Sequence, residues 1–407
     1  MEKHMKRSSQ FQVITPDPVT HRTELLDMTS KVFSRGMGYF GAHTWSKNAY
    51  IYNSNYDWNS SCIGIMDGRI VTHFGIWGYD MRIGRARVKT AGVGLVATHA
   101  DYRKRGLMGK TIRRCLELVL ENNYDVSLLF GIAHYYDRFG YVSAWVPSDY
   151  RVEGHLIGAG KPTHRIYKFA PRHRGDLATL YNRENATRTG TAVRPTYLKN
   201  QWPEKWSGYL WKDGRGKVIG YVIVARQDGD LQCVECVGDD AEVLAVLATL
   251  RKRWALRDLR FKNLHYDSPL RKRITRRMCW ERRRYIYTGG PMIRLVNLKS
   301  MLTKMTGELA HRLKQSHLAG WKGTLLLADA RDKVALNIHR SRVTIAEPSR
   351  SKHAIRGGER LAQLLIGGEQ PEEIIEAGKM RLTGDAPRLV DVLFPNQHPS
   401  LDTWDHY

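Results

Sequence analysis

The chain has 407 residues, and 65 Lys or Arg against 40 Asp or Glu give it a formal net charge of +25. Hydrophobic residues make up 42% and aromatic residues 10%, which excludes a largely disordered chain. The length predicts two or three folded domains. The charge predicts attraction to anions, whether an anionic cofactor, an acidic protein, nucleic acid or acidic lipid, without choosing among them.

Cysteines and apolar stretches narrow the class further. The five cysteines are too scattered for a disulfide framework, and Cys233 and Cys236, although spaced CxxC, have no second pair. We therefore interpret these two as strand residues and expect no metal site. No stretch reaches membrane-spanning length and the N-terminus has no apolar signal core, so we expect a cytoplasmic protein that does not contact a membrane.

The first elements can be read in chain order. Residues 24–33 show helical spacing of apolar side chains. Residues 34–53 are rich in aromatic residues and glycine, and we expect a loop there. Two runs of alternating apolar residues follow on either side of Asp67-Gly68, which predicts a β-hairpin.

Residues 88–141 are the most informative stretch. A strand over 88–98 leads into the basic turn Arg103-Lys104-Arg105-Gly106, a helix from Leu107 and a second strand over 126–130. The first N–H groups of a helix have no partner inside it and carry partial positive charge, so they bind phosphate well. Gly106 has no Cβ and would let the backbone approach a ligand closely. This order predicts a pyrophosphate site; the alternative is a solvated basic turn.

The remainder of the chain shows two further patterns. Alternating runs around Asp228-Gly229 predict a second hairpin, and residues 240–256 predict a helix capped by Asp239 or Asp240. Residues 292–305 predict a long amphipathic helix, and residues 323–348 alternate as strands do.

Two segments carry a family resemblance. The sequence THADYRKRGLMGKTI resembles the acyl-CoA pyrophosphate loop of the GNAT acyltransferases, whose pattern is Arg/Gln-x-x-Gly-x-Gly/Ala. Arg103 and Gly106 match this pattern, whereas Met108 departs from it and Gly109 stands one place late. The variant RKRGLM, followed by YDRFGY, resembles the Eis (enhanced intracellular survival) family of GNAT enzymes.

The resemblance implies an α/β (α+β) fold with three parts. Residues 1–150 would form a catalytic GNAT domain, residues 151–288 a second GNAT-like mixed-sheet domain without the cofactor loop, and residues 289–407 a sterol carrier protein-like domain. The stretch LTGDAPRLVDVLFP carries the last likeness. The family resemblance also implies an acetyl-CoA-dependent N-acetyltransferase that acts on a primary amine of a small molecule, with antibiotic-like molecules among the candidates, and that assembles as a homohexamer.

The resemblance further implies roles for particular residues. Tyr136 would be the general acid, since a phenol is protonated at neutral pH and can give a proton to a leaving thiolate. The C-terminal carboxylate of Tyr407 would be the general base, which requires burial or a relay because free α-carboxyls are weak bases. The backbone near Val96 would polarise the thioester carbonyl and pair with the pantetheine arm. The implied acetyl-CoA contacts are Val96, Ala97, Thr98, Arg103, Lys104, Arg105, Gly106, Leu107, Met108, Gly109, Gly131 and Ile132.

The acceptor and the partners are less defined. Candidate acceptor-pocket residues are Phe40, His43, Trp45, Tyr50 and His134, with ordinary packing or surface positions as the alternative. A net charge of +25 suits a polycationic acceptor poorly, so an acidic, neutral or carrier-bound amine is also considered. Residues 251–285 hold 14 Lys or Arg against 3 acids, which predicts either a nucleic-acid or acidic-protein surface or a solvated face. A lipid- or sterol-carrying protein with a relic acyltransferase fold is a further alternative.

Overall fold

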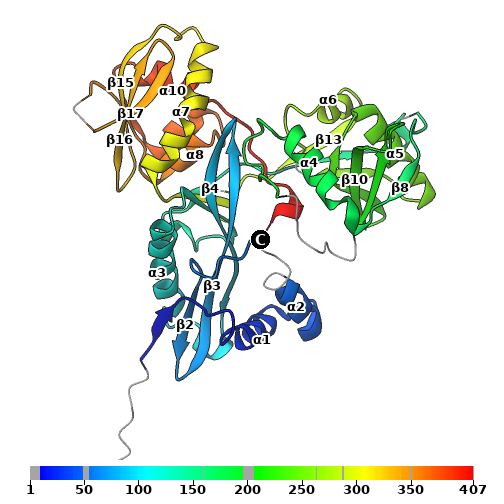
Figure 1. Cartoon of the computed structure of the whole chain (residues 1–407), viewed down its shortest axis with the longest axis horizontal. Coiled ribbons are helices and arrows are strands. Elements are labelled where there is room, and N and C mark those ends of the chain that lie inside the picture. Colours follow the sequence, from blue (N-terminus) through cyan, green and yellow to red (C-terminus); the bar gives the residue numbers. More distant parts are fainter. Residues whose placement is uncertain are drawn as a thin grey trace, which may run out of the picture. The chain divides into compact units, whose positions relative to one another are not determined.

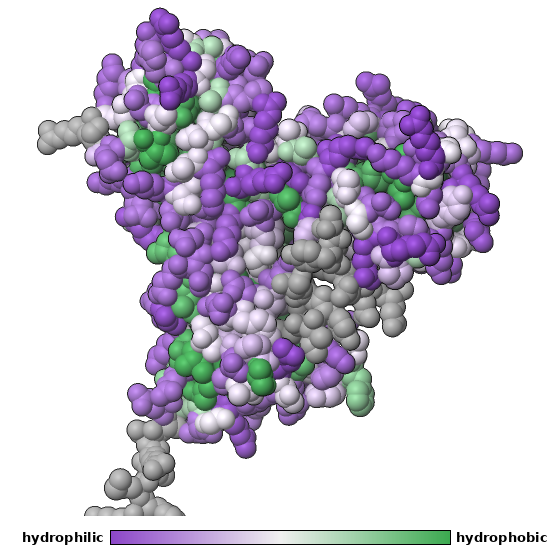
Figure 2. Space-filling view, viewed as in Figure 1, coloured by the Kyte–Doolittle hydropathy of each residue, from purple (hydrophilic) through white to green (hydrophobic). Residues whose placement is uncertain are grey.

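The computed structural model describes residues 10–48, 55–158, 160–195, 206–262, 264–286, 288–348 and 351–406. Within them the chain divides into two compact units, the first holding residues up to 79 and 89–129, and the second holding residues 80–88 and 130–406. Both are mixed α/β structures, which confirms the predicted fold class (Figure 1). Hydrophilic side chains cover most of the visible face, in keeping with the charged composition (Figure 2).

The first unit is built on a mixed sheet with the strand order β1-β2-β3-β4-β5. Its neighbours β1 and β2, and β2 and β3, are antiparallel, whereas β4 and β5 are parallel. The predicted hairpin is confirmed, because Asp67 and Gly68 take φ values of 53° and 73° between β2 and β3. The elements are β1 (Gln12–Ile14), α1 (Arg22–Phe33), α2 (Gly38–Lys47), β2 (Cys62–Met66), β3 (Arg69–Ile83), β4 (Ala86–Thr98), η2 (Ala100–Tyr102), α3 (Leu107–Glu121) and β5 (Val126–Gly131).

The second helix of this unit corrects an expectation. Residues 34–53 were expected to form a loop, but Gly38–Lys47 is the helix α2. Its two glycines have poor helix propensity, and packing overrides that preference. The helix contacts α1 through an edge-to-face pair between Phe33 and Trp45 with ring centroids 5.3 Å apart, and it buries Ala42 and Ser46.

The first part of the second unit contains a large sheet with the order β13-β7-β12-β11-β10-β9-β8. At the end of β5, strand β14 and then β6 add to the sheet to which β5 belongs. The elements are η3 (Asp137–Phe139), β6 (Val142–Ser143), β7 (Ser148–Val152), β8 (Ile166–Lys168), α4 (Arg174–Glu184), β9 (Trp206–Lys212), β10 (Val218–Gln227), β11 (Asp230–Val237), α5 (Asp240–Arg253), β12 (Leu259–Lys262), α6 (Pro269–Thr275), β13 (Cys279–Arg283) and β14 (Gly290–Leu295).

Local sequence signals in this region are confirmed. Asp228 and Gly229 take φ values of 53° and 80° in the β10–β11 hairpin. The Asp239 carboxylate accepts hydrogen bonds from the backbone N–H groups of Ala241 and Glu242, and so caps α5. Cys233 and Cys236 both lie on β11, as interpreted from the sequence.

The last part of the second unit has a five-stranded sheet with the order β17-β16-β15-β18-β19. Its long helix begins at Leu298 rather than near residue 292, because Gly290–Leu295 is the strand β14 and Asn297 caps the helix through Ser300 N–H. In the described ranges, no helix is both long and apolar enough to cross a membrane. The elements are α7 (Leu298–Lys314), β15 (Lys322–Ala328), β16 (Lys333–His339), β17 (Arg342–Ala346), β18 (His353–Arg356), η6 (Gly358–Arg360), α8 (Leu361–Leu365), α9 (Pro371–Gly378), β19 (Arg381–Thr383), α10 (Ala386–Leu393) and η7 (Thr403–Asp405).

Candidate active site

The basic turn of the first unit leaves the start of α3 open. Gly106 is the N-cap of α3, is exposed to solvent, and takes a φ of 73°. Among the described residues, no side-chain hydrogen bond caps this end of the helix. Arg103, Lys104 and Arg105 are all exposed around it. Partial positive charge from the helix and three full charges therefore face solvent at one place, as a pyrophosphate site requires.

The backbone conformation supplies a reason for glycine at position 106, and close approach of a ligand there stays a prediction. A Cβ placed on Gly106 would meet no atom within 4 Å, so the close approach of neighbouring protein atoms does not require glycine there. The left-handed φ of 73° does, because side chains with a Cβ are strained in that region. Lys104, with a φ of 60°, is a second left-handed residue in the same turn.

The start of α3 is held firmly by the core beneath it. Leu107 and Met108 are buried although they directly follow the exposed turn, and Gly109 is half-buried. The hydroxyls of Thr111 and Thr72 lie 2.7 Å apart and join α3 to β3. Because the first residues of the helix are fixed by packing, the directions of their N–H groups are fixed before any ligand binds.

Strand β4 changes direction beside its predicted cofactor-binding residues. Residues Thr90 to Val93 pair in parallel with Val126 to Leu129 of β5, and among the described residues this pairing ends at Val93. Leu95 then takes a φ of 46°, which is unusual for a residue with a branched side chain. The backbone of Val96, Ala97 and Thr98 follows this turn, where the sequence placed the pantetheine contacts.

A buried histidine holds this turn in place. His73 Nδ1 lies 2.8 Å from the carbonyl oxygen of Leu95, and its Nε2 lies 2.9 Å from the hydroxyl of Tyr56. Complete burial lowers the pKa of His73 to about 4, so the ring is neutral at physiological pH. Nδ1–H therefore donates to Leu95 and Nε2 accepts from Tyr56. This role could not be predicted from the sequence, since a single histidine in an apolar strand is usually structural.

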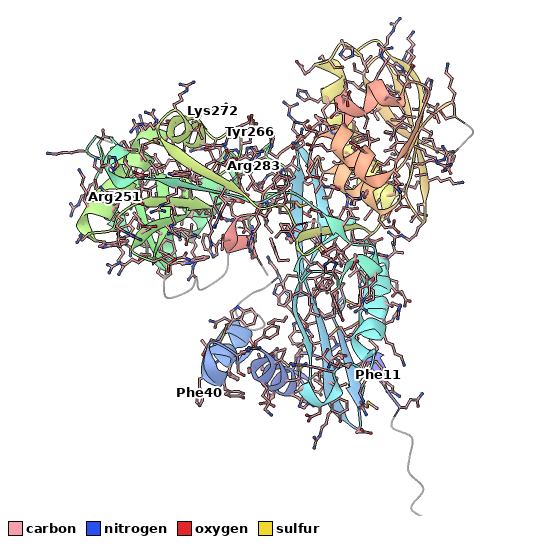
Figure 3. The ribbon with its side chains drawn as sticks, turned by 180° about the vertical axis from the view of Figure 1, so that it is seen from behind. Phe11, Phe40, Arg251, Tyr266, Lys272 and Arg283 are labelled. Carbon is pink, nitrogen blue, oxygen red and sulfur yellow. The ribbon has the colours of Figure 1, made fainter. Side chains whose placement is uncertain are left out.

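The candidate acceptor residues are not gathered into one site. Phe40, His43 and Trp45 all lie on α2, but Phe40 is 85% exposed and points away from the unit (Figure 3). Trp45 packs on Phe33. His134 belongs to the second unit, where it is exposed and its Nδ1 lies 3.3 Å from the hydroxyl of Thr288. Tyr50 lies outside the described residues. The part of these residues in acceptor binding stays a prediction.

Tyr136 lies in the second unit, just after the end of β5. Its side chain is 7% exposed, and burial, with a smaller effect of neighbouring Tyr135, raises the pKa of its hydroxyl. The hydroxyl therefore stays protonated throughout the neutral range, as a proton donor must. Gly131 ends β5 and Ile132 follows it with 66% of its side chain exposed, so both remain candidates for ligand contact.

The C-terminal segment is anchored, although Tyr407 lies outside the described residues. The ring of His406 stacks on Phe130 at the end of β5, with centroids 4.0 Å apart. Trp404 is 4% exposed. The last described residue thus lies beside the strand end from which Gly131, Ile132 and Tyr136 follow.

Buried charges hold this segment. The Arg194 guanidinium binds the carboxylates of both Glu235 on β11 and Asp405, and all three side chains are at most 8% exposed. The Tyr181 hydroxyl donates to Asp402 at 2.7 Å, and the Tyr181 ring lies 3.3 Å from the Arg194 guanidinium carbon. Nothing in the sequence analysis predicted this network.

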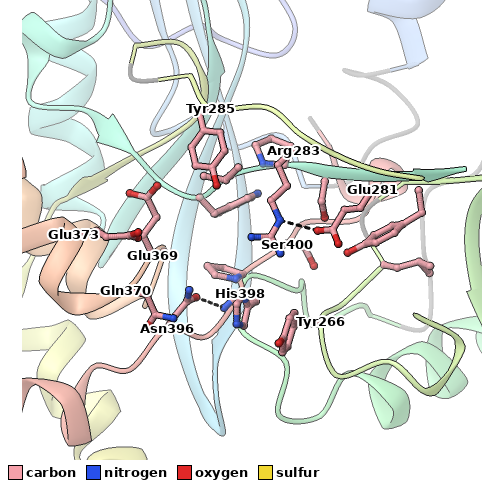
Figure 4. A pocket seen from close by; sticks show the side chains of 18 residues that line it. Tyr266, Glu281, Arg283, Tyr285, Glu369, Gln370, Glu373, Asn396, His398 and Ser400 are labelled. Atoms are coloured by element: carbon pink, nitrogen blue, oxygen red, sulfur yellow. Dashed lines mark hydrogen bonds and ion pairs between the residues drawn. The ribbon is translucent and has the colours of Figure 1, made fainter. Parts of the chain in front are cut away.

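A cavity of about 270 Å³ in the second unit lies between β13 and the start of α9 (Figure 4). Its main charged groups are already engaged: Glu281 binds Arg283 at 2.7 Å, and Glu369 accepts from Gln363 at 2.9 Å. Tyr266 stacks on His398 with ring centroids 3.9 Å apart. Because these lining side chains bind one another, we assign no ligand to this cavity. The residues that the structure describes hold no group of three His, Cys, Asp or Glu placed to bind a metal ion.

Comparison with known proteins agrees with the geometry of the first unit. Residues 20–144 match the family model of the acetyltransferase (GNAT) domain. The chain thus carries an acyltransferase domain of the GNAT class. No curated protein matches the sequence.

Solved structures share the fold over nearly the whole chain. A GCN5-related N-acetyltransferase from Kribbella flavida is 19% identical with a TM-score of 0.75, covering 98% of this chain and 100% of that one. A GCN5-related N-acetyltransferase from Anabaena variabilis is 16% identical with a TM-score of 0.77, covering 96% and 99%. Eis1 from Mycobacterium abscessus is 17% identical with a TM-score of 0.70, covering 97% and 100%. These likenesses concern the fold.

Proposed function

We propose that the protein is an acetyl-CoA-dependent N-acetyltransferase that transfers an acetyl group to a primary amine of a small molecule by direct attack. The observation that carries this proposal is the open start of α3, where Gly106 and three exposed cations meet no capping side chain. The GNAT match over residues 20–144 supports acetyl-CoA as the donor. The turn of β4 at Leu95 supports a thioester beside Val96.

The residues have distinct roles in this proposal. The turn from Arg103 to Gly109 would hold the diphosphate, and the backbone from Val96 to Thr98 would pair with the pantetheine amides. The N–H near Val96 would polarise the thioester carbonyl. The amine nitrogen then forms a bond to the acetyl carbon while the carbon–sulfur bond breaks.

Two groups would move the protons. Tyr136 would protonate the leaving thiolate, a role that its burial and raised pKa support. The carboxylate of Tyr407 would take the proton that the amine loses, directly or through water. The stacking of His406 on Phe130 supports this role, because it holds the chain end beside the end of β5.

The net charge of the chain is the only property that restricts the choice of acceptor amine. The chain carries a net charge of +25, so a polycationic amine would need a locally acidic pocket. An acidic, neutral or carrier-bound amine is an equal candidate for the acceptor. The sterol carrier protein-like character of residues 289–407, the three domain boundaries, a hexameric assembly and a cytoplasmic location rest on the resemblance and stay predictions.

The basic stretch 251–285 is partly neutralised within the fold. Six of its 14 Lys and Arg side chains form ion pairs, namely Arg257, Arg260, Arg271, Arg273, Arg282 and Arg283. This favours a solvated face, although Lys272 on α6 stays exposed (Figure 3). Salt-dependent retention of RNA that is lost on reversing the charges of Lys272 and Arg276 would instead establish a nucleic-acid surface.

A thiol-release assay with acetyl-CoA and a panel of amines tests the proposal. Tyr136→Phe and a chain lacking Tyr407 should each lower kcat about 100-fold or more, as expected for loss of a general acid or base. Tyr135→Phe is the matched control, because Tyr135 lies beside Tyr136 and should leave kcat within about 3-fold. Unchanged rates in both test variants would refute the acid and base roles. Absence of acetyl-CoA binding by calorimetry would favour the lipid-carrying alternative.

A further inference from the structure

Three cations form a row across the last sheet of the second unit. Lys333 on β16 is the register partner of Ala328 on β15, Ala328 is the partner of Arg356 on β18, and Arg356 is the partner of Arg381 on β19. Register partners point to the same face of a sheet. Lys333, Arg356 and Arg381, which we call the basic row, therefore line one face, with the methyl group of Ala328 between the first two.

The basic row lines a cavity of about 620 Å³ in the second unit. Lys379, at the end of α9, lines the same cavity. The lining also holds three acidic residues, Asp137, Asp329 and Glu359, against five Lys or Arg. Asp137 and Glu359 are exposed. Asp329 is 4% exposed, and its carboxylate accepts hydrogen bonds from the backbone N–H groups of Arg331 and Asp332. Among the described residues, no ion pair involves Lys333, Arg356, Lys379 or Arg381.

The register of the row opposes stability. Arg356 and Arg381 stand directly opposite one another in an antiparallel pair, and like charges in that position repel. Salt screens the repulsion between exposed charges, so the simplest alternative is that the basic row is an ordinary solvated surface. Screening does not explain why all three cations of the row line the same cavity as the small side chain of Ala328.

We propose that this cavity binds a small, multiply charged anion of the phosphate class, such as pyrophosphate or a nucleoside diphosphate. Guanidinium groups bind phosphate oxygens in a fork, and two of them stand on neighbouring strands here. The row spans three strand spacings, roughly 14 Å, which suits an anion with more than one charged group. A cavity of this volume holds a nucleotide-sized ligand. The site is separate from the turn before α3, which lies in the first unit.

Calorimetric titration of the full-length protein with inorganic pyrophosphate and with ADP tests this site. Saturating CoA in every titration fills the turn before α3, and a failure of CoA itself to bind would count against the proposed function alone. Arg381→Gln should weaken binding of the anion at least tenfold. Arg342→Gln removes the same charge from β17, outside the cavity, and should leave the affinity unchanged.

Thermal unfolding provides a second test, because a purely structural role of Arg381 would not give the result expected here. Without anion, Arg381→Gln should unfold at a higher temperature than the wild type, because repulsion across β18 and β19 is relieved. Added pyrophosphate should stabilise the wild type and not this variant. The proposal fails if neither anion binds saturably, if Arg342→Gln and Arg381→Gln weaken binding equally, or if single-stranded RNA binds there in preference to both small anions.

Discussion

Arg194 binds the carboxylate of Asp405 through two nitrogens, Nε to Oδ1 at 2.8 Å and Nη2 to Oδ2 at 2.7 Å. The other edge of the same guanidinium binds Glu235, with Nη1 2.7 Å from Oε1. One buried cation therefore ties the C-terminal segment to β11. This ion pair positions the residues immediately before Tyr407, the group to which we assign the proton-accepting carboxylate.

Removing Asp405 should release this segment. Asp405→Ala takes one of two carboxylates from a guanidinium that is 1% exposed, so we expect the free energy of unfolding to fall by about 2–3 kcal/mol. Glu347→Ala is the control, because Glu347 forms an exposed pair with Lys299 and should cost under about 0.5 kcal/mol. Urea denaturation measures both, and equal losses would show that burial of the Arg194 pair contributes nothing.

The same network should give the protein a distinct dependence on pH. Burial, followed by repulsion from Glu235, raises the pKa of Asp402 to about 7. The folded state thus keeps a proton that the unfolded chain releases near pH 4. As pH rises from about 4 to about 7, this group's contribution to the free energy of unfolding decreases, and above pH 7 it is constant.

Asp402→Asn isolates this contribution, because the amide has the same shape and does not titrate. Its unfolding free energy, measured by urea denaturation across this pH range, should decrease less with rising pH than that of the wild type. The Tyr181 hydroxyl can still donate to the amide oxygen, so the fold should be kept. Parallel profiles for the two proteins would mean that Asp402 is ionised in the folded state at all these pH values.

The two nitrogens of His73 can be tested separately. Asparagine places an N–H near the position of Nδ1 and should keep the hydrogen bond to Leu95, whereas glutamine mimics Nε2 and should lose it. We expect His73→Gln to cost about 2 kcal/mol of stability for an unpaired buried carbonyl, and to lower kcat with acetyl-CoA about tenfold. His73→Asn should lose clearly less activity. Equal activity in both variants would show that the Leu95 turn does not position the thioester.

Local signals carried the successful predictions from sequence. The turns at Asp67-Gly68 and Asp228-Gly229, the Asp239 cap and the start of α3 at Leu107 each depend on a few neighbouring residues. The helix α2 was missed because its glycines and aromatic residues argue against a helix, and only packing on α1 outweighs them.

The site's supporting contacts could not be predicted, because they join residues far apart in the sequence. His73 and Leu95 are 22 positions apart, Arg194 and Glu235 are 41, and Arg194 and Asp405 are 211. A single sequence carries no periodic or local pattern that pairs such residues. The cofactor turn was recognisable because its charges and its glycine are consecutive.

The conformation of the cofactor turn can be tested through its two left-handed residues. Gly106 has a φ of 73° and an added Cβ would touch nothing within 4 Å, so Gly106→Ala changes backbone strain alone. We expect it to lower the free energy of unfolding by about 1 kcal/mol and, by shifting the first N–H groups of α3, to raise KM for acetyl-CoA about tenfold. Lys104→Gly has the opposite backbone effect at a φ of 60° and should stabilise the fold slightly, while the loss of one charge raises KM only a few-fold, less at high salt. If Gly106→Ala left KM unchanged while destabilising the protein as expected, the diphosphate would have to bind elsewhere than at the start of α3.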